Sequence, residues 1–500
     1  MEEKLNQLKT ILAEVSDLNN AASLLGWDQQ TYMPAGGAEG RGYQLGTLGK
    51  IAHIKFTSDE VGELLNDLQT YQEQLDPDSD DACLIKITRR DFKKGTKVPP
   101  EWVANFAKET AVGYQVWQEA RAKNSFIKFK PNLERILEMR CQYASFFSPY
   151  DHVYDPLLDD FEPGLKTAEV QEIFANLRPQ QVALIQEITE RPQVDDSFLR
   201  QPFDEKGQWD FGVDVVTNFG YDWNRGRQDK SAHPFTESSG IDDVRITTRV
   251  DPENLSPCLF ATLHETGHGL YELGVDRSLA RTPLAHGTSL AVHESQSRMY
   301  ENLVGRSLPF WEFYYPSMQD AFPAQLGGID LDRFYKGINK VEPSLIRVEA
   351  DEATYNLHIM LRLELEIALM EGSLEVADLP EAWNERMQDY LGITPPNDAD
   401  GVLQDVHWSS GLIGYFSTYA LGNLISLQLW EVINKDIPDL TDQIRRGQLY
   451  PLLEWLHENI HRHGAKFEPQ ELVKRATGSK IDPAPYIRYL QTKFGEVYNL

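Results

Sequence analysis

The chain has 500 residues, 41% of them hydrophobic, and its 77 acidic and 48 basic residues give a net charge of −29. Such a surface repels phosphate backbones and anionic lipid, so we expect no nucleic-acid partner and no membrane partner. The three cysteines, Cys83, Cys141 and Cys258, lie far apart, which argues against a disulfide framework or a thiolate metal cluster and fits a reducing compartment.

The N-terminal part of the chain is dominated by helical patterns. Charged residues begin at position 2, and residues 1–25 lack the apolar core of a signal peptide, so we expect a cytoplasmic protein. Their apolar residues recur at helical spacing, and a Pro/Gly break follows at 33–37. Three later segments also predict helices: 58–75, 101–126 and 131–147.

Residues 207–250 have a different pattern. Apolar and polar residues alternate at 207–216 and again at 243–250, with turn-rich sequence between them, so we predict a small β element here. From residue 256 the pattern is helical again to near the end. The sequence therefore predicts a mainly α fold, a large helical body with a small β-sheet element, and a single domain over 1–500.

One stretch from Ser409 to Trp430 contains no charged residue. Its several Ser, Thr, Gln, Asn and Gly residues are unusual for a lipid-facing helix. We interpret it as a buried helix of a soluble protein.

The segment 256–268 carries the first candidate site. Ser256 suits a helix N-cap, and the helix would place His264 and His268 one turn apart on one face, with Glu265 beside them. Neutral imidazoles bind zinc without cancelling its charge, so nearby water is acidified. A carboxylate can then accept the proton as water attacks a carbonyl, which indicates a zinc peptidase with Glu265 as base. Gly267 implies that another segment approaches the helix closely.

The same motif occurs a second time at 457–461, so the motif alone cannot identify the metal site. Only 39 residues follow His461 (500 − 461), and the nearest downstream carboxylates are too close for a returning helix. We therefore interpret His457, Glu458 and His461 as ordinary polar residues of a helix.

A zinc peptidase site needs a third protein ligand. A second helix, predicted from its cap at Thr288 to Val304, could return antiparallel to the first and present Glu294 to the metal. His293 is the alternative ligand. We favour Glu294, because two histidines and one glutamate are the ligand set of thermolysin-like sites. The segment 256–305 is thus the predicted pair of zinc-binding helices.

The chain resembles the carboxypeptidase Taq family of metallocarboxypeptidases. Motifs in the same order carry the resemblance: WDQQTYMP at 27–34, HPF at 233–235, DVRIT at 243–247, HETGH at 264–268, HESQ at 293–296, IRVEAD at 346–351 and GVLQDVHW at 401–408. The resemblance implies a helical fold with a deep active-site groove, similar to the neurolysin and angiotensin-converting-enzyme group. It implies a homodimer, one zinc ion per subunit with cobalt as a substitute, and release of single residues from peptide C-termini with broad specificity. Residues 1–126 would form a helical lid over the groove.

A carboxypeptidase must recognise a terminal carboxylate, for which the fork of a buried arginine is suited. Arg347 is the candidate, on a helix predicted from about Ser344 to Glu371, and the resemblance also indicates it. The alternative is a salt bridge between Arg347 and Asp351 within that helix.

Other residues are candidates for substrate contacts. His407, Tyr415 and Tyr419 could donate hydrogen bonds to the oxyanion, in an order that resembles the angiotensin-converting-enzyme group, or could be packed aromatics. Arg245 lies on a predicted strand that could pair with a peptide, although we favour an ion pair with Asp243. His233 either contacts substrate or braces the groove.

Two other functions remain open from the sequence. A zinc oligopeptidase or dipeptidase that cuts within short peptides would use the same metal site and leave Arg347 structural. A helical peptide-binding protein with a vestigial site is the alternative outside enzymes, but such a protein has no need of Glu265.

Overall fold

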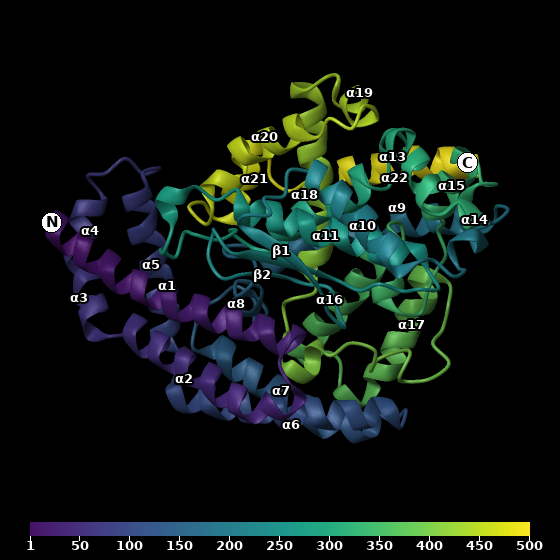
Figure 1. The fold of residues 1–500 in the computed structure, drawn as a ribbon. Helices are drawn as coiled ribbons and strands as arrows, with labels where there is room; N and C mark the ends of the chain where they lie inside the picture. The colour runs from purple at the N-terminus through teal and green to yellow at the C-terminus, as the bar shows by residue number, and fades with distance from the viewer. The chain divides into compact units, whose positions relative to one another are not determined.

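The computed structural model describes residues 1–500, which fold into two compact units. The first unit contains Met1–Thr96, Asp196–Ile338 and Leu429–Gly478, and the second contains Lys97–Asp195, Asn339–Gln428 and Ser479–Leu500. Helices dominate both units, so the mainly α fold with a small sheet is confirmed (Figure 1). The single domain, the lid and the groove stay predictions.

The first unit contains all the strands. Its helices and strands are α1 (Glu2–Thr31), α2 (Ala38–Phe56), α3 (Asp59–Asp67), α4 (Gln69–Gln72), α5 (Asp80–Lys97, to Thr96), α10 (Glu205–Asn218), β1 (Gly226–Lys230), β2 (Thr236–Ser238), β3 (Val244–Thr248), α11 (Leu255–Leu273), α12 (Leu290–Arg298), a π-helical turn at Met299–Val304, α13 (Leu308–Ala321), α14 (Pro323–Leu326), α15 (Leu331–Ile338), α19 (Leu440–Arg445), α20 (Tyr450–Asn459) and α21 (Pro469–Thr477).

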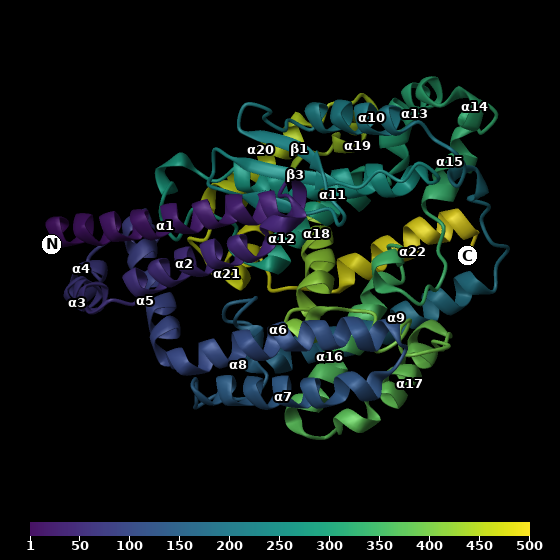
Figure 2. The same cartoon turned by 60° about the horizontal axis from the view of Figure 1, so that its bottom comes forward.

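The second unit is helical throughout, and α6 and α7 lie side by side in it (Figure 2). Its helices are α6 (Pro100–Ala122), α7 (Phe126–Ser145), α8 (Asp155–Leu158), α9 (Thr167–Thr189), α16 (Tyr355–Glu371), α17 (Leu379–Leu391), the part of α18 (Ser417–Asp436) up to Gln428, and α22 (Ala484–Tyr498).

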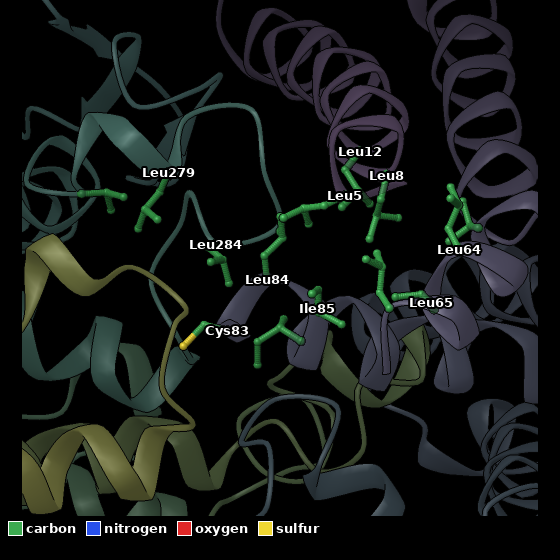
Figure 3. Close-up of a cluster of buried hydrophobic side chains, with 14 of the residues drawn as sticks. Leu5, Leu8, Leu12, Leu64, Leu65, Cys83, Leu84, Ile85, Leu279 and Leu284 are labelled. Carbon is green, nitrogen blue, oxygen red and sulfur yellow. The ribbon is translucent and has the colours of Figure 1, made fainter. Parts of the chain in front are cut away.

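A hydrophobic cluster joins the N-terminal helices to the segment that follows α11. Leu5, Leu8 and Leu12 form the buried face of α1, and leucines of α3 and α5 pack against them (Figure 3). Leu279 and Leu284, a few residues beyond α11, belong to the same cluster. Each fully buried leucine contributes roughly 1.5–3 kcal/mol, so this cluster holds α1 firmly against the chain beyond α11.

The sheet has the strand order β1-β3-β2, with β1 parallel and β2 antiparallel to β3. The strand predicted within 243–250 is confirmed as β3. The strand predicted at 207–216 is wrong, because this segment lies in helix α10, capped by Asp204. The segment also carries apolar residues at helical spacing, and these form a single buried face of α10: Phe211, Gly212, Val215 and Val216.

Several predicted boundaries shift in the structure. The helix expected at 58–75 is two helices, α3 and α4, whereas the helices expected at 101–126 and 131–147 correspond to α6 and α7. The uncharged stretch enters an α-helix only at Ser417 and is mostly buried along α18, so the predicted buried helix is confirmed from that residue on. None of the helices has both the length and the apolarity that crossing a membrane requires.

Candidate active site

Helix α11 carries the first motif. The side chain of Asn254 caps it by accepting a hydrogen bond from the backbone N–H of Ser256, so the helix begins slightly earlier than predicted, and Gly274 follows its last residue. Since residues four apart share a helix face, His264 and His268 lie side by side, with ring centroids 5.0 Å apart.

Helix α12 passes very close to α11 at Gly267. A Cβ atom at this position would lie 2.5 Å from both the backbone O of Gln296 and the Cα of Ser297. The glycine therefore allows two backbones to approach, as its place in a helix predicted. The close approach brings Glu294 of α12 to the histidines of α11.

Three side chains form one candidate metal site. The Nε2 atoms of His264 and His268 lie 3.7 and 3.6 Å from Oε2 of Glu294. All three ligand atoms lie within 4.8 Å of one another. Ligands at about 2.0–2.2 Å from a tetrahedral zinc ion lie roughly 3.3–3.6 Å apart, so the donor set fits such an ion.

The two histidines are held by their other ring nitrogens. Nδ1 of His264 lies 2.9 Å from Oε2 of Glu301, and the ring of His268 is hydrogen-bonded to the backbone of His293. Burial alone would raise the pKa of Glu301, but Arg298 and His264 hold it at about 2, so this carboxylate is ionised. Metal-binding histidines are oriented in this way, which is a second feature that fits a metal.

Glu265 lies on the neighbouring face of α11 and is 6% exposed. The hydroxyl of Thr236 in β2 donates a 2.7 Å hydrogen bond to its Oε2. Burial raises the pKa of Glu265, while His264 and the Thr236 hydrogen bond oppose the rise. A raised pKa brings a carboxylate closer to the value that suits a general base near neutral pH.

His293, the rival ligand, is engaged elsewhere. Its Nε2 lies 2.7 Å from Oε1 of Glu272, and it does not belong to the group of side chains that could hold the ion. The cap of its helix is Ser289 rather than the predicted Thr288.

The second motif has a different geometry. Helix α20 ends at Asn459, so His457 and His461 do not share a helix face. His457 is half-exposed, as predicted, but His461 is fully buried, where its Nε2 lies 2.9 Å from Oε1 of Gln296. The prediction of an ordinary polar helix residue is therefore wrong for His461. The chain leaves α20 before this residue, and His461 packs against α12.

Two proposed substrate-binding residues lie on or beside the sheet. Arg245 of β3 forms two hydrogen bonds with Asp243, at 2.7 and 2.8 Å, and its guanidinium lies 4.3 Å from the ring centroid of Trp27. This is the ion pair favoured from the sequence. His233 is exposed, and its carbonyl accepts a hydrogen bond from Ser231.

Arg347 lies in the second unit, in a short 3₁₀ turn before α16 rather than inside the predicted helix. The alternative pairing with Asp351 is wrong, because that carboxylate accepts backbone N–H bonds from Glu342, Ala353 and Thr354. Arg347 is 5% exposed and pairs with Asp405 instead, at 2.9 Å.

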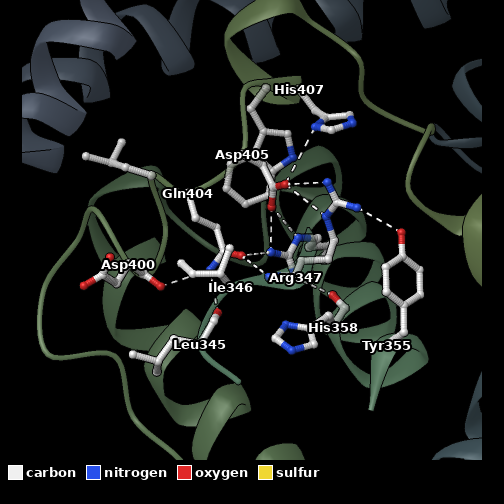
Figure 4. A network of polar contacts seen from close by, with 12 residues as sticks. Leu345, Ile346, Arg347, Tyr355, His358, Asp400, Gln404, Asp405 and His407 are labelled. Atoms are coloured by element: carbon white, nitrogen blue, oxygen red, sulfur yellow. Dashed lines mark hydrogen bonds and ion pairs between the residues drawn. The ribbon is translucent and has the colours of Figure 1, made fainter. Parts of the chain in front are cut away.

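Asp405 is shared by two arginines (Figure 4). Nε of Arg362 donates to its second oxygen at 2.7 Å, and Nη1 of Arg347 donates to the hydroxyl of Tyr355 at 2.9 Å. Burial would raise the pKa of Asp405, but Arg362 and Arg347 hold it well below its usual range. Burial lowers the pKa of His407 to about 4 despite Asp405. Arg347, Arg362 and Asp405, together with the neutral ring of His407, therefore form a cluster with a net charge of +1.

The three proposed oxyanion donors come together in the same unit. The ring of His407 lies 5.3 Å from that of Tyr415 and 6.4 Å from that of Tyr419, centroid to centroid. Glu366 supports the segment between them, since it accepts hydrogen bonds from Nε1 of Trp408 and the backbone N of Gly414.

Known proteins are similar to this chain in sequence and fold over nearly its whole length. The family model described as carboxypeptidase Taq (M32) metallopeptidase matches residues 7–494. Thermostable carboxypeptidase 1 of Thermus thermophilus is 40% identical over 497 residues, which covers 97% of each chain. The chain belongs to the carboxypeptidase Taq family. It is a metallocarboxypeptidase, a peptide hydrolase.

Other members of the carboxypeptidase Taq family are similar to this chain to a comparable extent. Carboxypeptidase 1 of Bacillus subtilis is 37% identical over 98% of each chain. The crystal structure of the M32 carboxypeptidase from Deinococcus radiodurans matches with a TM-score of 0.97 and 40% identity, covering 100% of both chains. The structure of the Pyrococcus furiosus carboxypeptidase matches with a TM-score of 0.95.

Several residues that contact the candidate side chains within one unit or the other were not assigned a role from the sequence. They are Thr236, Arg298, Glu301, Tyr355, Arg362, Glu366, Gln404 and Asp405. Some of them have a local signal. Arg298 and Glu301 lie four and seven residues, or one and two helical turns, beyond Glu294, and Gln404 and Asp405 belong to the motif at 401–408.

We expect Gly267→Ala to destabilise the enzyme by about 1–3 kcal/mol, since its methyl group meets backbone atoms of α12 rather than a flexible side chain. The displaced helix carries Glu294, so metal affinity should fall as well. Thermal unfolding with and without added metal measures both effects. Gly46→Ala is the matched control, because a Cβ atom there meets nothing within 4 Å, and its melting temperature should stay level or rise. Equal behaviour of the two variants would contradict the close contact.

We expect Glu301→Gln to weaken metal binding by about 10–100-fold. The amide carries no charge, so it holds the His264 N–H less strongly and weakens the contact with Arg298, which also donates to Glu294. Competition with a chromophoric chelator measures the change. Glu312→Gln, which alters an exposed ion pair with Arg445, should leave the affinity as in the wild type. An unchanged affinity in Glu301→Gln would show that its carboxylate does not support the ligand.

Proposed function

We propose that this metallocarboxypeptidase uses zinc to release single amino acids, with broad specificity, from the C-termini of peptides. The observation that carries the proposal is the convergence of His264, His268 and Glu294 beside the buried carboxylate of Glu265. These three ligands would hold the ion. When bound, zinc supplies a Lewis acid that polarises a carbonyl and lowers the pKa of water. The same donor set also accepts cobalt.

The protein's own groups would supply the proton transfers. Glu265 takes the proton of the attacking water and later returns it to the leaving amine. Thr236 holds one of its oxygens and so fixes the direction of the other. For the oxyanion we propose a donor among His407, Tyr415 and Tyr419, whose rings form one cluster.

We propose Arg347 as the group that recognises the terminal carboxylate of the peptide. The support is electrostatic: its cluster carries a net charge of +1, which an entering carboxylate would neutralise. Contacts of His233 and Arg245 with the peptide stay proposals, as do the homodimer and the cytoplasmic location. All three cysteines are unpaired, as expected in a reducing compartment.

Mass spectrometry of a short unstructured peptide tests the function. We expect stepwise loss of single C-terminal residues, abolished by a chelator and restored by zinc. The C-terminal amide of the same peptide should be a poor substrate. Internal cleavage, or equal cleavage of acid and amide, would instead identify the zinc oligopeptidase that the sequence left open.

A further inference from the structure

A cavity of about 850 Å³ lies within the first unit, next to the catalytic helix and the sheet edge. It is lined by α1, α2, the turn at 237–243 and the loop at 280–286, and Glu272 of α11 lines it as well. The three metal ligands and Glu265 are not among its lining residues. It is a space distinct from the metal site.

The cavity nevertheless adjoins the metal site along two elements. Glu272 is one helical turn beyond His268 on the same face of α11, about 6 Å further along the axis. Glu237 directly follows Thr236, which binds Glu265, in the edge strand β2. One residue of a strand spans about 3.3 Å, so the backbone of Glu237 lies close to that of Thr236, while its side chain points to the opposite face of β2.

Two carboxylates in the inner part of the cavity, those of Glu237 and Glu272, have no lysine or arginine partner. Glu272 is 5% exposed, and its Oε1 receives His293 and the backbone N of Gly287, whereas its Oε2 has no hydrogen-bond partner. Glu237 accepts a hydrogen bond from Ser23, and no basic side chain acts on it. Burial raises the pKa of Glu237, and the like charge of Glu272 adds to the rise.

The other charged groups of the lining are already neutralised. Asp243 pairs with Arg245, and Asp242 with Arg225. Arg281 forms two hydrogen bonds with Asp17, and Asp91 pairs with Arg90. The carboxylates of the lining that have no lysine or arginine partner are thus Glu237 and Glu272.

We propose that this cavity is a charge-selective subsite for a cationic group of the peptide on the amino side of the cleaved bond, with Glu237 and Glu272 as its carboxylates. The inference rests on the proposed function and deepens it. An enzyme that releases one residue places a single residue beyond the cleaved bond, so a cavity large enough for several residues accommodates the amino side. The cation is either the free α-ammonium group of a short peptide or a lysine or arginine side chain.

Steady-state kinetics on a set of matched four-residue peptides tests the proposal. The set contains an N-acetylated neutral peptide, the same peptide with a free amino terminus, and N-acetylated peptides with lysine or neutral norleucine before the C-terminal residue. We expect the cationic peptides to show a kcat/KM about 10–100-fold higher, mainly through KM. A gain from the free terminus identifies the α-ammonium group, and a gain from lysine identifies the side chain.

Two variants separate the subsite from the protein's general negative charge. In Glu237→Gln the preference for cationic peptides should shrink about tenfold or more, while Asp242→Asn, a paired carboxylate of the same cavity, should keep it. A preference that arises only from the surface potential would vanish with added salt in both variants alike. Metal content and melting temperature verify that each variant is folded.

The outcomes separate the proposed subsite from the proposed carboxypeptidase function. Equal kcat/KM for cationic and neutral peptides, or a lysine preference only at the released position, would overturn the subsite and leave the carboxypeptidase function intact. Absence of C-terminal release from every peptide would overturn the proposed function itself.

Discussion

Replacing Glu265 with glutamine should lower kcat about 10²–10⁴-fold, because an amide cannot take a proton from the attacking water. The substitution keeps the size of the side chain, and its oxygen can still accept the hydrogen bond from Thr236. The amide is also uncharged, which removes the cost of burying an ionised carboxylate. We therefore expect the variant to fold with at least the stability of the wild type.

The measurement combines peptide turnover with metal content and thermal unfolding. A loss of kcat at full metal occupancy assigns the effect to the proton transfer rather than to the ion. The exposed Glu253→Gln serves as the matched control, with kinetics like the wild type. Activity of Glu265→Gln within about threefold of the wild type would rule out this residue as the general base, since a base contributes at least about 100-fold.

The candidate metal site could be predicted because its geometry is local. His264, Glu265 and His268 lie on one helix, so their spacing alone defines their relative positions. The third ligand needed one long-range step, the return of a second helix, and the sequence carried a signal for it in Gly267. The structure shows the corresponding close approach, since a Cβ atom at Gly267 would lie 2.5 Å from the backbone of α12.

Residues that meet only through tertiary contacts could not be predicted in this way. The sequence offered Asp351 as the partner of Arg347 because it is close along the chain, but the actual partner is Asp405. His461 looked like a surface residue of α20, yet the helix ends before it and the ring is buried against Gln296. At 207–216 the alternating pattern was read as a strand, whereas the i, i+4 pattern of Phe211 and Val215 determined the helix.

The charges around Arg347 explain why two arginines share one carboxylate. With Arg362 alone, Asp405 would form a neutral buried pair, and an entering anion would find no net attraction. With Arg347 added, and with His407 kept neutral by burial, the cluster carries one excess positive charge. Burying that charge is costly without an anion, so the free enzyme is arranged to gain from binding one.

The final expectation follows from this charge. Arg347→Ala should lower kcat/KM for free-acid peptides by about 30-fold to several thousand-fold, the equivalent of about 2–5 kcal/mol for a buried charge pair that loses one partner. The same variant should hardly affect C-terminal amides, which already lack the interacting charge. The ratio of acid to amide turnover, large in the wild type, should therefore approach one. Steady-state kinetics on both peptides measures it.

A conservative variant separates binding from structure. Arg347→Lys keeps the positive charge but not the two-pronged fork, so it should recover part of the acid preference. Arg135→Lys, on the exposed face of α7, should match the wild type on both peptides. If Arg347→Ala instead lowered acid and amide turnover equally, Arg347 would act by holding Asp405 and Tyr355 in place, and the terminal carboxylate would have to be recognised by another group.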